Sequence, residues 1–246
     1  AGEQLRDRAY APPTRVRIHD QHGFHAPFYN GQILADRLRR TFTDDSAQRV
    51  VLLGPHDADA PPFLLLGADS LGRDVFSRLV LGARWSLSVA LLGTLAALVL
   101  GAVFGAGAAV LGGATERWLM RGADLVLVLP LVYVVLALRA IVPAVLSPFA
   151  VSTLLTALFA LVAWPHPARG VRAITAGELR KDYVEAARAA GAGRWRVLRH
   201  VLPASYGFLA AEVVLLVPAL LSAEAAISFL GLGFPENKTA WVHQQP

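Results

Sequence analysis

The sequence has no cysteine and only two lysines, and each shortage excludes a class of chemistry. Without cysteine, neither a disulfide framework nor a thiolate site can form in these residues. The two lysines, Lys181 and Lys238, follow Arg180 and Asn237, so the Gly-Lys pair that a phosphate-binding P-loop requires is missing. The metalloprotease pattern H-E-x-x-H and the hydrolase pattern G-x-S-x-G are absent as well. We therefore expect a protein that is not itself an enzyme.

Charge is also scarce, and its distribution is uneven. Charged residues make up 17% of the chain and hydrophobic residues 55%, whereas an ordinary soluble domain carries about 25% charged residues. Residues 1–84 hold 11 basic and 10 acidic side chains, but the stretch from Ser86 to Leu111 holds none. This contrast predicts a polar N-terminal third followed by a membrane-embedded remainder.

Residues 1–66 predict a small, loop-rich extramembrane segment. Alternating polar and apolar residues over 14–19 predict a strand, and residues 21–23 predict a turn that follows it. Residues 33–42 predict a short helix. The segment also contains an H-x-x-H-x-x-H array formed by His19, His22 and His25, and imidazoles are common metal ligands.

Four apolar segments predict membrane spans. The first, Ser86–Leu111, is long enough to cross a hydrocarbon layer of about 30 Å with some tilt. It contains the G-x-x-x-G pair Gly101 and Gly105, which predicts close packing against a neighbouring helix. We expect a partner subunit to supply that helix. The other three predicted spans cover residues 119–138, 148–164 and 204–229.

The last predicted span contains Glu212 and Glu224, and a carboxylate at that depth is costly and usually faces protein or a water-filled path. Two interpretations remain open for them: a polar translocation path, which would also include Ser228, or hydrogen bonds between helices.

Basic residues in the short loops predict the orientation. Two of them follow the first span and eight lie between the third and fourth, whereas only Arg139 lies between the second and third. The ten are Arg117, Arg121, Arg169, Arg172, Arg180, Lys181, Arg188, Arg194, Arg196 and Arg199. Cytoplasmic loops carry the excess of basic residues. The segment after the first span and the segment between the third and fourth spans are therefore predicted to be cytoplasmic, and both chain ends external. This bias also explains the net charge of +5 without nucleic-acid binding.

The long cytoplasmic segment, residues 169–203, predicts two short helices around a hinge. Residues 179–190 are rich in helix formers, and Gly191 fits the left-handed position that ends a helix. From Arg194 onward, Trp195, Leu198, Val201 and Leu202 recur at helical spacing and predict an amphipathic helix at a membrane surface.

Three motifs in this order resemble a known family. Residues 183–193, Y-V-E-A-A-R-A-A-G-A-G, followed by R-H-V-L-P at 199–203, are similar to the EAA loop of ABC importer permeases. Residues 67–78, G-A-D-S-L-G-R-D-V-F-S-R, and residues 223–233, A-E-A-A-I-S-F-L-G-L-G, resemble motifs of the dipeptide/oligopeptide/nickel branch. The resemblance covers residues 67–241. Ala68 departs from the usual threonine, and the stretch from Gly191 to Pro203 is one residue shorter than the family pattern.

The resemblance implies an all-α membrane protein with a MetI-like permease core at 67–246, multi-pass in the inner (cytoplasmic) membrane and without a cofactor. It implies a further span before residue 1 and another after Pro246. The implied partners are ABC ATPase subunits that hydrolyse ATP, a second permease subunit, an extracytoplasmic substrate-binding protein and the lipid bilayer. The implied cargo is peptides or related small solutes.

The resemblance also assigns residues. Those implied to couple to the ATPase are Tyr183, Glu185, Ala186, Ala187, Arg188 and Gly191. Those of the motif before the first span are Gly67, Asp69, Gly72, Arg73, Asp74, Ser77 and Arg78. The alternative function is a metal-binding or sensory membrane protein that uses the array of His19, His22 and His25.

Overall fold

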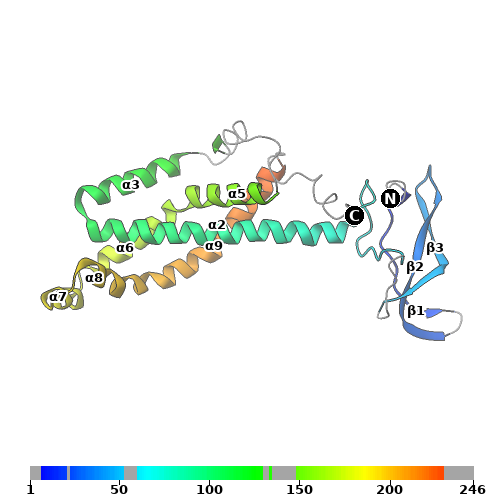
Figure 1. Ribbon diagram of the computed structural model, residues 1–246, viewed down its shortest axis with the longest axis horizontal. Helices are drawn as coiled ribbons and strands as arrows, with labels where there is room; N and C mark the ends of the chain where they lie inside the picture. Colours follow the sequence, from blue (N-terminus) through cyan, green and yellow to red (C-terminus); the bar gives the residue numbers. More distant parts are fainter. Residues whose placement is uncertain (1–6, 21–22, 53–59, 130–132, 135–147, 230–246) are drawn as a thin grey trace. The chain divides into compact units, whose positions relative to one another are not determined.

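The computed structural model describes residues 7–20, 23–52, 60–129, 133–134 and 148–229 (Figure 1). The chain divides into two units, residues 1–84 and residues 85–246, and each is described by itself.

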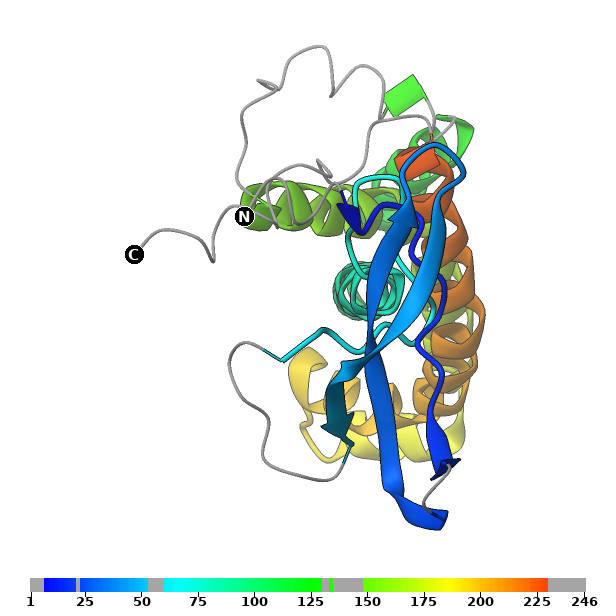
Figure 2. The ribbon, with the colours of Figure 1, turned by 90° about the vertical axis from the view of Figure 1, so that its right-hand side faces the viewer.

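The N-terminal unit contains a three-stranded antiparallel sheet. Its strands are β1 (Arg17–Asp20), β2 (Gly23–Asp36) and β3 (Thr41–Val51), in the order β1-β2-β3 (Figure 2). The strand predicted near residues 14–19 is confirmed as β1. Tyr29 anchors the sheet, because it is 2% exposed and its hydroxyl donates a hydrogen bond of 2.8 Å to the carbonyl oxygen of Pro61.

The helix predicted over residues 33–42 is wrong, because these residues form the β2–β3 hairpin. Leu34 pairs with Phe42, and Asp36 pairs with Thr41. Between them the Asp36 carboxylate accepts hydrogen bonds from the backbone N–H groups of Leu38 and Arg39, at 2.8 and 3.2 Å. An aspartate that binds the backbone in this way stabilises a turn in competition with a helix.

The helix α2 (Val75–Leu111) contains the first predicted span, Ser86–Leu111, and begins before it. Asp74 causes the earlier start, because its carboxylate accepts the N–H groups of Phe76 and Ser77 at 3.1 and 3.2 Å. Such a cap satisfies amide groups that the first turn of a helix leaves without partners. With 37 residues and a rise of 1.5 Å per residue, α2 is longer than a membrane span of about 20 residues needs.

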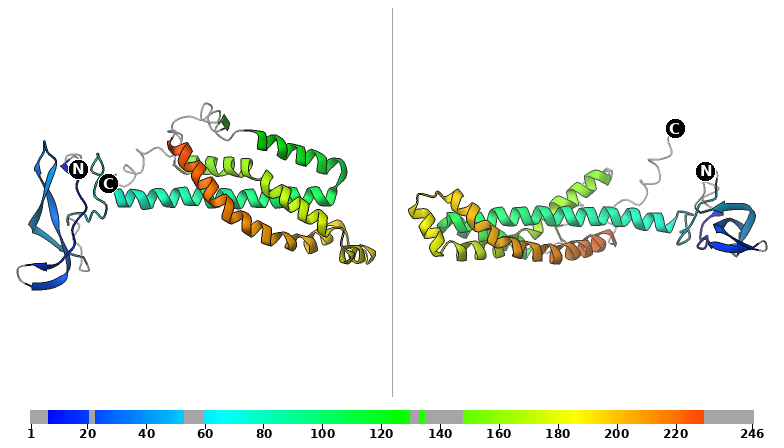
Figure 3. Two further views of the ribbon diagram at one scale, coloured as in Figure 1. Left: turned by 180° about the vertical axis from the view of Figure 1, so that it is seen from behind. Right: turned by 90° about the horizontal axis from the view of Figure 1, so that it is seen from below.

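The remaining described helices follow in the second unit (Figures 1 and 3). They are α3 (Gly113–Val128), α5 (Pro148–Ala163), α6 (Pro165–Glu178), α7 (Asp182–Ala189), α8 (Arg194–Val201) and α9 (Tyr206–Phe229), with a 3-10 turn at Leu202–Ser205 before α9. Of the second predicted span, α3 covers the part up to Val128, and residues 130–132 and 135–138 lie outside the described residues.

The α5 and α6 helices meet at a bend of 43°. Pro165 opens α6, where its missing N–H costs nothing. Residues 169–178, for which the sequence analysis predicted no helix, are helical as part of α6. In the described part of the chain, two helices are long and apolar enough to cross a membrane, and the bent pair makes three if it is one span.

Two of the hydrophobic clusters in this unit hold α2, α3, α5, α6 and α9 together. The first joins α2, α5 and α9 through side chains that include Val89, Phe159 and Leu220. The second joins α3 and α6 through Ala123 and Ala168, with Leu100 of α2 packed against it. The helix α2 is thus in contact with α5, α6 and α9, as the views in Figure 3 show.

The G-x-x-x-G pair of α2 packs against another helix of the same chain. A Cβ atom added to Gly101 would lie 2.7 Å from Cγ of Pro167, and one added to Gly105 would overlap the carbonyl oxygen of Ala168. Both contacts belong to α6. The expectation that a partner subunit supplies the neighbouring helix is therefore wrong, because the chain's own α6 fills this position.

Candidate functional site

The α7 helix is short, and its C-terminus is closed by backbone hydrogen bonds. Gly191 has a φ of +82°. Its N–H donates to the carbonyl of Arg188 at 2.9 Å, and the N–H of Ala192 donates to the carbonyl of Ala187 at 2.9 Å. This pair of bonds is a Schellman motif, in which a left-handed residue suits glycine best. The prediction that Gly191 ends this helix is confirmed.

Three valines hold α7 against α8. Val184, Val197 and Val201 are 1%, 4% and 0% exposed and form one cluster. Successive residues of a helix are about 100° apart, so burying Val184 turns Ala186 to the opposite side. Ala186 is exposed, together with Tyr183 and Glu185, whereas Ala187 is half-buried. The alanine-rich outer face of α7 is thus open in the described structure.

Trp195 was predicted on the apolar face of an amphipathic helix at a membrane surface, and this stays a prediction. Its side chain is 83% exposed. The inner face of α8 is set by Val197 and Val201, which are four residues apart and pack on Val184. Trp195 lies two residues before Val197, about 200° around the helix, and therefore points away from this contact.

A polar cluster links the end of α6 to the start of α7. The Tyr183 hydroxyl and the Lys181 ammonium group donate to the Glu178 carboxylate at 2.8 and 2.6 Å. The hydrogen bond to this carboxylate raises the pKa of Tyr183 and the pKa of Lys181. The Tyr183 hydroxyl thus connects the first turn of α7 to the last residue of α6.

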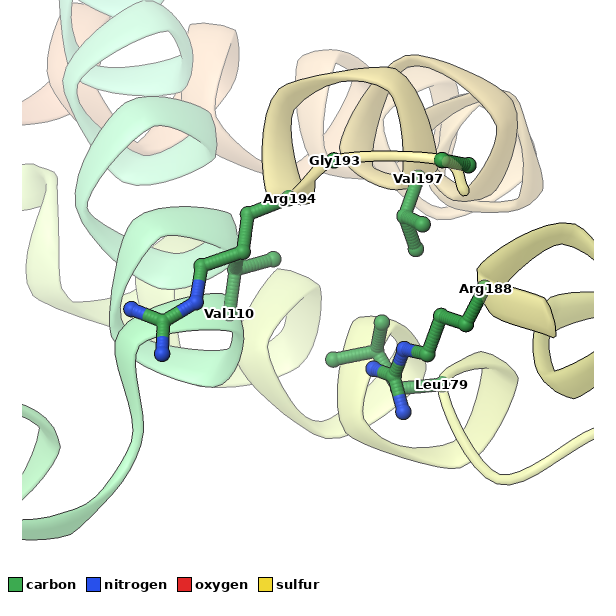
Figure 4. A pocket seen from close by; sticks show the side chains of 7 residues that line it. Val110, Leu179, Arg188, Gly193, Arg194 and Val197 are labelled. Atoms are coloured by element: carbon green, nitrogen blue, oxygen red, sulfur yellow. The ribbon is translucent and has the colours of Figure 1, made fainter. Parts of the chain in front are cut away.

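A cavity of about 420 Å³ lies behind α7 (Figure 4). Arg188, one turn after Val184, contributes to its wall rather than to the outer face of α7. The lining residues come from α2 and from the segment 179–197, and they are Val110, Leu179, Arg188, Ala192, Gly193, Arg194 and Val197. Motif reasoning from the sequence did not connect Val110 with these residues, since it lies far from them in the chain.

Ion pairs tie α3 to α6. Arg169 pairs with Asp124, and Nε of Arg172 donates to Oε1 of Glu116 at 2.6 Å. The loop after α2 and the segment that begins with α6 are the two that the charge pattern assigned to the same side of the membrane. The ion pairs bring α3 and α6 of these segments into contact.

The motif at 67–78 is organised around Asp69. One oxygen of its carboxylate accepts the backbone N–H groups of Leu71 and Arg73, both at 2.9 Å. The other accepts Nε of Arg73 at 2.9 Å and Nη1 of Arg78 at 2.5 Å. Gly67 and Gly72 have φ angles of +80° and +77°, which glycine adopts without strain. The motif therefore builds a rigid turn immediately before α2, and Asp74 and Ser77 of the same motif form the helix cap.

Asp69 should make this turn sensitive to acid. Burial alone would raise its pKa, but the hydrogen bonds from Arg73, Leu71 and Arg78 outweigh burial and lower it to about 2. A carboxylate whose pKa falls on folding stabilises the fold above its unfolded pKa, near 4, and this contribution is lost as the pH falls toward 2. Because the side chain is 19% exposed, we expect about 2 kcal/mol at neutral pH.

The Asp69→Asn variant tests this role. At neutral pH it should unfold at lower temperature than the parent and be cleaved faster by trypsin at Arg73 and Arg78, and the difference should shrink below pH 3. The matched control is Asp44→Asn, which removes the exposed ion pair to Arg17 and should cost less than about 1 kcal/mol. Equal losses in both variants at neutral pH would contradict the role of Asp69.

The two carboxylates of α9 are both buried, at 3% exposure for Glu212 and 4% for Glu224. Oε2 of Glu212 lies 3.2 Å from Nδ1 of His166 on α6. This contact favours the interhelical hydrogen bond among the two interpretations of Glu212. Ser228 is exposed. Sequence reasoning missed His166, although its position between Pro165 and Pro167 places a titratable group in an otherwise apolar stretch.

The predicted histidine array is described only at His19. Its ring makes an edge contact with the ring of Phe24, with centroids 5.1 Å apart. His22 and the side chain of His25 lie outside the described residues. Among the residues that the structure describes, no three histidine, aspartate or glutamate side chains gather as metal ligands would.

Comparison with known proteins finds many bacterial permeases. The chain is 31% identical over 188 residues to the oligopeptide transport system permease protein OppC of Bacillus subtilis, covering 75% of this chain and 60% of that protein. It is 35% identical to the dipeptide transport system permease protein DppC of the same species, covering 71% and 53%. It is 33% identical to the glutathione transport system permease protein GsiD of Pectobacterium atrosepticum, covering 72% and 57%.

The chain thus spans a little over half the length of these curated relatives. Residues 97–244 also match the family described as "Binding-protein-dependent transport system inner membrane component". This match covers most of the helical unit, from the middle of α2 past the end of α9. The chain therefore belongs to the family of binding-protein-dependent transport system inner membrane components, whose MetI-like helical permease fold it shares.

Proposed function

We propose that the chain works as a permease subunit of an ATP-binding-cassette importer for peptides or related small solutes. The cargo class rests on the relatives, whose names specify oligopeptides, dipeptides and glutathione. The same family membership supports a location in the inner membrane and partnership with a substrate-binding protein. ATP hydrolysis belongs to a separate subunit, because this sequence has no Gly-Lys pair, which a phosphate-binding P-loop requires.

The observation that carries the coupling part of this proposal is the exposed alanine-rich face of α7. The helix is fixed from behind by Val184 and closed at its end by Gly191. Ala186 and Ala189 form a low ridge between exposed charged side chains. A ridge of this kind fits a helix-in-groove contact, in which small side chains allow close approach. The partner groove belongs to the ATPase subunit, and Tyr183 and Glu185 set the register of the contact.

The orientation follows from the same segment. The α3, α6, α7 and α8 helices carry eight of the ten basic residues of the charge pattern, and Arg180 and Lys181 lie between α6 and α7. This excess of basic residues supports a cytoplasmic location for the connecting segments. The N-terminal sheet unit is then extracytoplasmic, on the side where a substrate-binding protein delivers its cargo. A second permease subunit completes the translocation path, and the exposed apolar surfaces of α2 and α9 are shared between that subunit and lipid.

Deletion of the gene from cells that carry it, followed by plasmid complementation, tests the transport function. Uptake of a labelled pentapeptide, a labelled dipeptide and labelled glutathione is measured in parallel. At least one uptake should fall to background on deletion and return on complementation with the full-length protein. If all three stay at the parental rate, while a deletion of a known peptide permease lowers them, the proposed cargo class is wrong.

A further inference from the structure

The basic residues of the cytoplasmic segment fall into two groups. Arg169, Arg172 and Lys181 are each paired with a carboxylate. In the part of the chain that the structure describes, five others make no ion pair and no side-chain hydrogen bond; Arg180 precedes α7, and the other four lie on α7 and α8. These are Arg188, Arg194, Arg196 and Arg199. Unpaired positive charge is therefore concentrated on these two short helices.

Two of the unpaired arginines line the cavity behind α7. Figure 4 shows that Arg188 extends beside Leu179 and Arg194 beside Val110, with the two guanidinium groups apart from each other at different parts of the lining. Val110 stands at the end of α2, one residue before the helix stops at Leu111. The rest of the wall is apolar or small, through Leu179, Ala192, Gly193 and Val197. The cavity thus combines two guanidinium groups with apolar walls at the end of a membrane helix.

The N-terminus of α8 adds to this positive potential. Gly193 occupies the cap position and lines the cavity, and it has no side chain to satisfy the first N–H groups of the helix. A helix start of this kind favours an anion. Neither Arg188 nor Arg194 makes an ion pair in the described part of the chain, and a guanidinium group is matched to the oxygen atoms of a phosphate.

We propose that this cavity binds the phosphate headgroup of an anionic phospholipid. The arginines contact the headgroup from two parts of the lining, and the first part of an acyl chain lies along Val110 and Leu179. A phospholipid fits better than a free phosphate ion because the cavity has apolar walls at the end of α2, where a span meets the membrane–water boundary. The site does not depend on the docking of α7, since Ala186 faces the other way and the lining residues are all in this chain.

Calorimetric titration of the full-length protein, purified alone in mild detergent, tests the site. The probes are dioctanoyl phosphatidylglycerol, dioctanoyl phosphatidylcholine and inorganic phosphate. The cavity variant is Arg188→Gln with Arg194→Gln. The matched control is Arg180→Gln with Arg199→Gln, which removes the same charge from exposed positions outside the cavity. Circular dichroism confirms the helix content of both variants.

Phosphatidylglycerol should bind the parent protein more tightly than phosphatidylcholine. Its affinity should fall by roughly thirtyfold or more in the cavity variant and by less than about threefold in the control. Equal losses in the two variants would overturn the proposal, because they would indicate diffuse attraction to the whole basic surface. Equal affinity for phosphatidylcholine would also overturn it. Binding of inorganic phosphate as tight as that of the lipid would show that the ligand is a free anion.

Discussion

A Gly105→Leu variant should fail to accumulate as folded protein in the membrane. The added Cβ would overlap the carbonyl oxygen of Ala168, and backbone cannot move aside as a flexible side chain can. Forcing the atoms in would separate α2 from α6 and expose the cluster around Trp164. We expect a cost of at least about 3 kcal/mol, at the upper end for overpacked cores. Membrane abundance and the thermal midpoint in detergent measure this loss.

The matched control for this variant is Gly107→Leu, two residues further along the same helix. A Cβ atom on Gly107 would have nothing within 4 Å, so the larger side chain should be accepted at near-parental abundance. If the Gly105 and Gly107 variants accumulate equally well, α6 does not pack on the G-x-x-x-G pair, and the pair is free for another subunit.

An Ala186→Trp variant should lose transport while it keeps its place in the membrane. Ala186 lies on the exposed side of α7, away from the valine cluster, so the tryptophan should not disturb the fold. It would overfill a groove shaped for a small residue, at a cost on the order of 1–3 kcal/mol, which corresponds to roughly five- to 150-fold in affinity. Co-purification of the ATPase and uptake of labelled peptide should both fall, at unchanged abundance of the permease.

Two controls define this result. Ala186→Ser keeps a small side chain at the same position and should transport normally. Arg180→Ala removes an exposed charge on the approach to α7 and should have little effect. If the tryptophan variant transports like the serine variant, α7 is not the docking element, and the coupling role carried over from the family fails for this chain.

Local signals in the sequence predicted the helical part of the fold well. Gly191 was recognised as a helix end because its requirement is a single backbone conformation, and residues 204–229 were recognised as a span because their apolar run is long. The predicted helix at 33–42 failed because the bonds from Asp36 to the following amide groups outweigh helix propensity. The predicted span begins at Ser86 because charge ends there, whereas the helix itself begins at the cap that Asp74 forms, which charge content does not reveal.

What the sequence could not reveal depends on contacts between distant segments. The G-x-x-x-G pair indicates that something packs closely, but only the fold identifies α6 as the partner. Similarly, Glu212 indicates a buried polar contact, and the fold identifies His166. Arg188 belongs to a motif implied to face an ATPase, yet its position one turn from Val184 directs it to the cavity. In each case the residue type indicated what kind of contact to expect. The partner of that contact is known only from the way the helices pack.

The central claim is that α7 docks an ATPase subunit from the cytoplasmic side, and photo-crosslinking tests it directly. Benzoylphenylalanine is placed at Ala186 in the full-length protein within native membranes, and at Phe229 as a control. Phe229 is 93% exposed at the far end of α9. Irradiation should yield an adduct with the mass of an ATPase subunit from position 186 and none from position 229. An absence of the adduct at position 186, or an equal yield from both positions, would contradict this account.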